Sequence, residues 1–130
     1  MTIAPKKILL VHNDRQERGR LAIMLSRFGH EVKFSCGRDC PDQLTRAHDV
    51  VIVDDSLSGQ SGLDFIDNIP SRQRKKIIYL SPLSSLVATK IQDLNIYEWV
   101  TKPIDPLKLA VVVCDYFVES AMEQVINLRL

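Results

Sequence analysis

Short apolar runs, each ended by polar or turn-forming residues, recur along this chain and alternate with segments of helical spacing. Residues 8–11 and 50–53 are unbroken runs of Ile, Leu and Val, and residues 77–80 form a third apolar run. Continuous runs of this length are typical of strands buried on both faces of a parallel sheet. Two further strands are predicted, at residues 31–36, where apolar and polar residues alternate, and at residues 98–101.

Helix signals separate these strands. Asp14 has the character of a helix N-cap, with Glu17 completing a capping box, and Gly29 follows as the stop. Pro106 opens the last helix at its first turn. The other helices are predicted at residues 39–47, 63–69 and 83–94, the last with Leu86, Ile91 and Leu94 turned inward. Five strands alternating with five helices predict an α/β fold, a parallel sheet with helices on both faces.

The composition is that of an ordinary globular domain. A chain of 130 residues with 45% hydrophobic and 25% charged residues predicts a single domain. A net charge of +1 gives no electrostatic basis for binding nucleic acid. No run is long enough for a membrane span, and residues 1–7 lack the apolar region of a signal peptide. Cys36, Cys40 and Cys114 have no metal-binding spacing, so we expect free thiols and a cytoplasmic protein.

Polar residues follow the carboxyl ends of four of the predicted strands. They are the triplet at residues 12–14, Asp54, Ser81 and Lys102. In a parallel sheet these strand ends lie along one edge, which is where open α/β sheets bind their ligands. We therefore expect these residues to converge, although they are spread over most of the chain.

The order of these pieces resembles the receiver domain of two-component response regulators. The resemblance rests on the run at residues 8–11 with its polar triplet, Val53–Asp54 followed by Gly59 and Gly62, Leu80–Ser81, and Thr101–Lys102–Pro103. It extends to about residue 116. It implies a flavodoxin-like five-stranded parallel sheet with strand order 2-1-3-4-5. It also implies a phosphorelay signalling module rather than an enzyme.

The resemblance implies roles for individual residues. Asp54 would be the phosphoacceptor, a carboxylate nucleophile. Lys102 would hold a phosphoryl oxygen, and the Ser81 hydroxyl would move to bind the phosphoryl group. Trp99, three residues before Lys102, would be the family's switch aromatic, so that Ser81 and Trp99 are the expected switch residues. The backbone carbonyl of Ser56 would be a metal ligand.

The residues after the first strand depart from the family pattern. Receiver domains carry two acidic residues there, and this chain has His12 and Asn13. In the family that pair holds Mg²⁺, which neutralises charge on the transferring phosphoryl group. Each missing carboxylate removes on the order of 1 kcal/mol or more of attraction, about tenfold in affinity. A remaining Mg²⁺ site would draw on Asp54, Ser56, Asn13 and Asp14, so we expect weak or absent binding.

Two neighbouring residues carry expectations of their own. Asp55 is expected to point to the opposite side of the strand end from Asp54, because side chains alternate along a strand. Ser58 stands where the family commonly has proline, and is expected to loosen the following loop.

The predicted last helix carries an apolar heptad seam. Its members are spaced 4, 3, 4, 3, 4 and 3 residues apart: Leu107, Val111, Cys114, Val118, Ala121, Val125 and Leu128. The first half is expected to cover the sheet, whereas the second half runs beyond the length that the domain needs. We therefore expect a receiver-like domain at residues 1–120 and a helical extension at residues 121–130. The residues expected to form a homodimer or output surface are Val118, Ala121, Val125 and Leu128.

Two functions are compatible with the sequence. The first is a receiver domain with a degenerate Mg²⁺ site that acts mainly through protein contacts or dimerisation. The second is a conventional receiver, phosphorylated on Asp54 by a histidine kinase or a phosphotransfer protein. Plainer alternatives are a loop-capping Asp54, a surface Lys102 and a core Trp99. A transition-metal site from His12, Asp14 and Asp54 is a further alternative, and flavin binding lacks the necessary phosphate loop.

Overall fold

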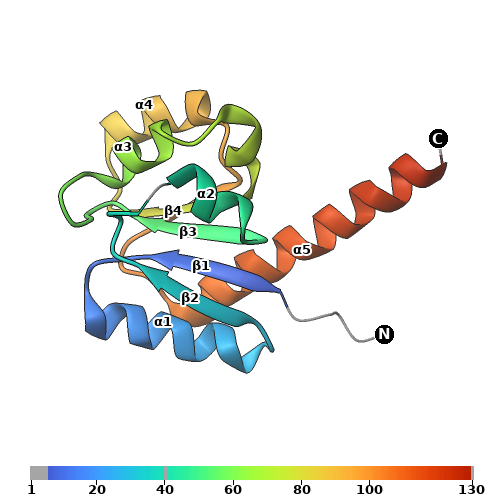
Figure 1. The fold of residues 1–130 in the computed structure, drawn as a ribbon, viewed down its shortest axis with the longest axis horizontal. Coiled ribbons are helices and arrows are strands. Elements are labelled where there is room, and N and C mark those ends of the chain that lie inside the picture. Colours follow the sequence, from blue (N-terminus) through green and yellow to red (C-terminus); the bar gives the residue numbers. More distant parts are fainter. Residues whose placement is uncertain (1–5, 40, 130) are drawn as a thin grey trace.

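The computed structural model shows a three-layer α/β domain and describes residues 6–39 and 41–129 (Figure 1). The strands are β1 (Lys7–Val11), β2 (Glu31–Ser35), β3 (Val50–Asp54), β4 (Ile77–Ser81) and β5 (Glu98–Thr101). The helices are α1 (Arg15–Arg27), α2 (Pro41–Arg46), α3 (Gly62–Asp67), α4 (Ser85–Leu94) and α5 (Pro106–Arg129), with a 3₁₀ segment η1 (Ser71–Lys76). All strand pairs are parallel in the order β2-β1-β3-β4-β5, which confirms the predicted fold class.

Each face of the sheet has its own apolar core. The helices α1 and α5 cover one face, where Leu21, Leu25 and Val113 belong to the same buried cluster. The helices α2, α3 and α4 cover the other face, where Phe65 and Leu94 are buried. The central strands β1 and β3 are buried on both faces, apart from Lys7 at the start of β1, as expected for unbroken apolar runs.

The start of α1 differs from the predicted capping box. The Asp14 carboxylate accepts hydrogen bonds from the amides of Gln16 and Glu17, which confirms it as the N-cap. The Glu17 carboxylate does not return to the Asp14 amide. It is paired with Arg20 at 2.6 Å, and the Asp14 amide donates to His12 Nδ1 instead.

The prediction that Leu86 faces inward is wrong. Its side chain is 61% exposed. The helix α4 begins at Ser85 after its N-cap Ser84, and the face that it turns to the sheet carries Val87, Ile91 and Leu94. These three residues continue the i, i+4, i+7 pattern, and Leu86 lies outside it.

The helix α5 covers the sheet with a different stripe from the predicted seam. Its buried residues are Leu109, Ala110, Val113 and Phe117, whereas Leu107, Val111 and Val118 are about half exposed. The expectation that the first half of the seam covers the sheet is therefore wrong. The helix carries two apolar stripes at helical spacing, and the stripe with Phe117, which packs on His30 and Tyr116, is the one that is buried.

The second half of α5 leaves the body of the domain (Figure 1). The side chains of residues 121–128 are exposed. No helix of the described residues combines the length and the apolar character needed to cross a membrane. Cys36 and Cys114 are free thiols, and Cys40 lies outside the described residues.

A close backbone approach at Gly62 positions the end of β3. A Cβ atom at Gly62 would collide with the Asp54 carbonyl oxygen and lie 2.9 Å from Cε1 of Tyr79. We expect Gly62→Ala to lower the free energy of unfolding by about 1–3 kcal/mol in urea titrations. The matched Gly19→Ala, in α1 with nothing within 4 Å of the added Cβ, should raise it by about 0.5–1 kcal/mol. Equal effects of the two substitutions would contradict this account.

Candidate functional site

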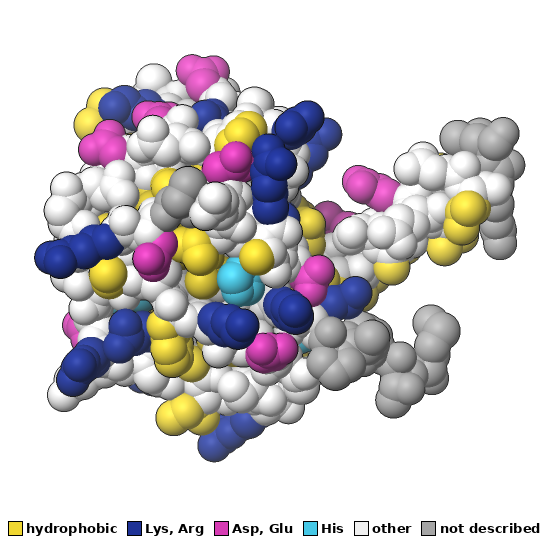
Figure 2. Space-filling view, viewed as in Figure 1, with side chains coloured by type: hydrophobic (Ala, Val, Ile, Leu, Met, Phe, Trp, Pro, Cys, Tyr) yellow, Lys and Arg dark blue, Asp and Glu magenta, His cyan; other side chains and the backbone are white. Residues whose placement is uncertain are grey.

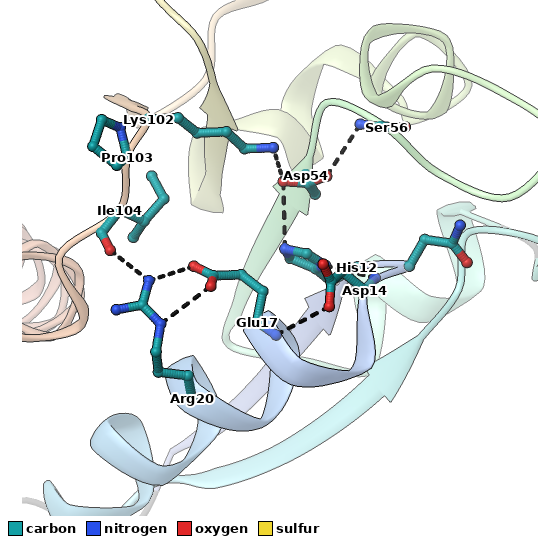
Figure 3. A pocket seen from close by; sticks show the side chains of 10 residues that line it. His12, Asp14, Glu17, Arg20, Asp54, Ser56, Lys102, Pro103 and Ile104 are labelled. Atoms are coloured by element: carbon teal, nitrogen blue, oxygen red, sulfur yellow. Dashed lines mark hydrogen bonds and ion pairs between the residues drawn. The ribbon is translucent and has the colours of Figure 1, made fainter.

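An open pocket of about 840 Å³ lies at the carboxyl edge of the sheet (Figure 3). Three strand ends and the start of α1 build it. Its lining residues are His12, Asn13, Asp14, Glu17, Arg20, Asp54, Ser56, Lys102, Pro103 and Ile104. The structure thus brings together three of the four strand ends that the sequence analysis singled out. The fourth, Ser81, is not among the lining residues.

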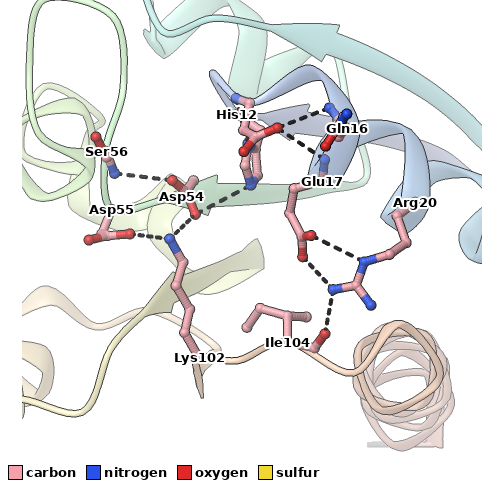
Figure 4. Close-up of polar contacts among 10 residues, drawn as sticks. His12, Gln16, Glu17, Arg20, Asp54, Asp55, Ser56, Lys102 and Ile104 are labelled. Atoms are coloured by element: carbon pink, nitrogen blue, oxygen red, sulfur yellow. Dashed lines mark hydrogen bonds and ion pairs between the residues drawn. The ribbon is translucent and has the colours of Figure 1, made fainter.

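Asp54 is the most buried carboxylate of this pocket, with 3% of its surface exposed. Its Oδ2 accepts a hydrogen bond from the Ser56 amide at 3.2 Å. Its Oδ1 faces Lys102 Nζ at 2.8 Å and His12 Nε2 at 3.5 Å (Figure 4). Both oxygens therefore already face nitrogen groups of the protein.

Lys102 lies between two carboxylates rather than one. Its Nζ is 2.8 Å from Asp54 Oδ1 and 2.5 Å from Asp55 Oδ1. The prediction that Asp55 points away is wrong, because β3 ends at Asp54 and strand alternation no longer applies to the next residue. Burial lowers the pKa of Lys102, but hydrogen bonds and charges from the two carboxylates outweigh it and raise that pKa above its ordinary value.

The donors expected for Mg²⁺ are mostly engaged elsewhere. The Asp14 carboxylate caps α1, and Asp54 Oδ1 lies beside Lys102. Position 12 offers an imidazole in place of a hard oxygen, so the Ser56 carbonyl and the Asn13 amide are left as neutral donors. This set fits Mg²⁺ poorly, because protein sites hold Mg²⁺ through carboxylate oxygens in near-octahedral geometry, and the donors left here are neutral. Within residues 6–39 and 41–129, no group of three His, Cys, Asp or Glu side chains could hold a metal ion, which gives the transition-metal alternative no support.

Ser81 and Trp99 form a separate hydrogen-bonded pair. The buried Ser81 hydroxyl accepts from Trp99 Nε1 at 2.8 Å and donates to the Pro82 carbonyl at 3.1 Å. Trp99 packs partly buried beside the core on the α4 side of the sheet. The two residues predicted to act together are thus in direct contact, and the hydroxyl must exchange partners before it can reach Asp54.

The loop after β3 is tied down, contrary to the expectation for Ser58. The Ser58 amide donates to the Cys36 carbonyl at 3.1 Å, and its hydroxyl accepts from Arg38 at 2.8 Å. The Gln60 side chain donates to the Gly37 carbonyl at 2.7 Å. A proline at position 58 would lack the amide, so the serine fastens this loop to the one after β2.

Sequence reasoning missed the Glu17–Arg20 pair as part of the pocket. Arg20 Nη2 contacts Glu17 and also donates to the Ile104 carbonyl at 2.8 Å, which links α1 to the loop before α5 (Figures 3 and 4). The i, i+3 charge pair is visible in the sequence. Its contact with a carbonyl 84 residues away is not.

Comparison with known proteins shows which proteins this chain is similar to. No family model matches the chain. The DNA-binding transcriptional regulator NtrC of Azospirillum brasilense is 31% identical over 110 residues, covering 82% of this chain and 23% of NtrC. The chain thus spans about a quarter of that relative. The activated receiver domain of DrrB is 27% identical, with a TM-score of 0.71 over 87% of this chain and 97% of that one.

Two further solved structures agree. The receiver domain of NtrX from Brucella abortus is 25% identical, with a TM-score of 0.69 over 84% of this chain and 96% of that one. The signal receiver domain of a LuxO repressor protein from Vibrio parahaemolyticus, 19% identical, shares the fold with a TM-score of 0.78 over 94% and 97% of the two chains. The chain therefore has the flavodoxin-like receiver fold and is similar in sequence to response-regulator receiver domains, in agreement with the resemblance in its sequence.

Proposed function

We propose that this receiver domain works without a tightly held Mg²⁺ and signals mainly through protein contacts, including self-association through α5. The observation that carries this proposal is the pairing of Lys102 with both Asp54 and Asp55. The module would act in the cytoplasm and would not be an enzyme.

The charge of the site supports weak metal binding. Asp54 and Asp55 each contribute −1 and Lys102 contributes +1, so the group carries −1 where the two carboxylates alone would carry −2. A divalent cation must compete with an ammonium that already contacts both carboxylates. His12 and Asn13 add no negative charge to attract it.

A conventional phosphoacceptor is the second candidate, and one observation favours it. The Asp54–Lys102 contact and the Ser81–Trp99 hydrogen bond together retain the acceptor, the cation and the switch pair of the family. In this alternative, a histidine kinase or a phosphotransfer protein would phosphorylate Asp54 at high Mg²⁺ concentration.

The exposed stripe of α5 supports self-association. Val118, Val125 and Leu128 are 49%, 49% and 86% exposed and lie on the predicted seam, as does Ala121. Figure 2 shows hydrophobic side chains along the lower edge of the projecting helix. We accordingly propose residues 1–120 as the receiver unit and residues 121–130 as an extension that dimerises or joins an output partner. Burying these side chains against a second copy gains about 1.5–3 kcal/mol for each large one.

Mg²⁺ titration tests the metal-poor site. We expect no saturable heat in calorimetry and no saturable change in Trp99 fluorescence at concentrations that fill an ordinary receiver, because two carboxylate ligands are missing. Calorimetry is needed beside fluorescence, because the Trp99 indole contacts Ser81 and does not line the pocket. A tight, saturable site would overturn the proposal. Acetyl phosphate with Mg²⁺, followed by mass spectrometry of the parent and of Asp54→Asn, then tests the conventional alternative.

A further inference from the structure

His12 is fixed in the pocket at both its backbone and its ring. Its amide donates to the Ser35 carbonyl at 2.9 Å, and 4% of its surface is exposed. Its ring Nδ1 accepts a hydrogen bond from the Asp14 amide at 3.1 Å. Its other nitrogen, Nε2, points at Asp54 (Figures 3 and 4).

These contacts determine which ring nitrogen carries the proton. A nitrogen that accepts a hydrogen bond from a backbone amide uses its lone pair and carries no proton. The proton of a neutral His12 therefore resides on Nε2, 3.5 Å from Asp54 Oδ1. That oxygen is buried and has no hydrogen-bond partner among the described residues, and its nearest nitrogen neighbours are His12 Nε2 and, as an ion pair at 2.8 Å, Lys102 Nζ.

We propose that His12 is locked by the Asp14 amide as the neutral Nε2–H form and presents a fixed N–H donor to Asp54, which keeps metal ions out of the site. This inference rests on the proposed metal-poor function and supplies its cause. The position that receiver domains give to a metal-binding carboxylate holds a hydrogen-bond donor here. A donor directed at Asp54 Oδ1 adds to Lys102 in stabilising the carboxylate without a metal ion.

The same lock excludes metals that normally favour imidazole. A metal bound at Nε2 requires the ring proton to move to Nδ1. There it would face the Asp14 amide proton, and both groups would lose their hydrogen bond. Groups that orient a metal-binding histidine change metal affinity by about 10–100-fold, and in this site the orienting group opposes binding.

The hydrogen bond itself can be observed by NMR in ¹⁵N-labelled protein. We expect a scalar coupling between the Asp14 amide nitrogen and His12 Nδ1, together with a proton on Nε2. His48 is an internal control of the opposite kind, because its Nδ1 lies 2.7 Å from the Leu44 carbonyl and must donate. A proton on His12 Nδ1, or the absence of the coupling, overturns the proposal.

A matched pair of variants tests the exclusion of metals, with Zn²⁺ as the probe. Asp14→Ala removes the capping carboxylate but keeps the amide, whereas Asp14→Pro removes both. We expect Zn²⁺ to shift the His12 signals of Asp14→Pro at about 10–100-fold lower concentration than those of Asp14→Ala. Equal responses overturn the exclusion, and if Asp14→Pro does not fold, the coupling in the parent decides.

The failures of the two proposals can be told apart. Tight Mg²⁺ binding overturns the proposed function even where the coupling is present. A missing coupling alongside weak Mg²⁺ binding overturns only the role of His12.

Discussion

Replacing Val125 and Leu128 by Glu is expected to convert a self-associated protein into monomers. Both side chains are exposed on α5 and make no contribution to the two apolar cores. In a two-fold dimer each substitution counts twice, so four apolar contacts are lost and four like charges face one another across the seam. At about 1.5–3 kcal/mol for each buried side chain, the dissociation constant should rise by at least about 10,000-fold.

Sedimentation velocity over a range of concentrations measures this effect. Ile126→Glu with Asn127→Glu is the matched control, because it adds the same charge at neighbouring exposed positions outside the heptad seam. At concentrations where both are monomeric, the control and the seam variant should unfold at nearly the same temperature. A parent that is monomeric at high micromolar concentration would end the dimer proposal, and the seam would then serve an output partner.

Restoring the two family carboxylates is expected to create a Mg²⁺ site. His12→Asp with Asn13→Asp places two hard oxygen ligands beside Asp54 and removes the N–H donor that faces it. The gain should be about tenfold for each carboxylate and about 100-fold together. Without Mg²⁺ the double variant should be less stable than the parent, because two like charges join Asp54 and Asp55.

The change in unfolding free energy on adding Mg²⁺ provides a readout independent of fluorescence. At a Mg²⁺ concentration 100 times the dissociation constant, the double variant should gain about 2.7 kcal/mol of unfolding free energy. Gln16→Asp with Gln92→Asp adds the same charge at two exposed residues outside the pocket and should gain nothing comparable. A folded double variant that ignores Mg²⁺ would show that the pocket is not the metal position of the family.

The sequence predicted the sheet well because unbroken apolar runs have few alternatives. The runs at residues 8–11, 50–53 and 77–80 each became a buried central strand, and the polar residues after them line one pocket except for Ser81. The alternation of side chains along a strand gave a wrong prediction at the point where the strand ends. Asp55 follows the last residue of β3, and its direction is set by the turn and by Lys102.

Periodicity also failed where one helix carries two apolar stripes. In α5 both stripes have helical spacing, and the sequence alone does not say which one meets the sheet. The packing of Phe117 against His30 decides this, and that contact joins residues far apart in the chain. The hydrogen bonds of Ser58 are equally non-local, so a rule based on residue type gave the wrong expectation for its loop.

The helix α5 begins at Pro106, only four residues after Lys102, so a small rotation at its start would move its far end much further. The pocket ends at Ile104, whose carbonyl is held by Arg20, and α5 starts two residues later. A straight helix of 24 residues is about 36 Å long. A tilt of about 5° at Pro106 therefore displaces the far end by about 3 Å, at 1.5 Å of rise per residue. A tilt of that size would move the residues of α5 that pack on the sheet, such as Leu109 and Val113, much less than the exposed tip, where the displacement is comparable to the size of a side chain.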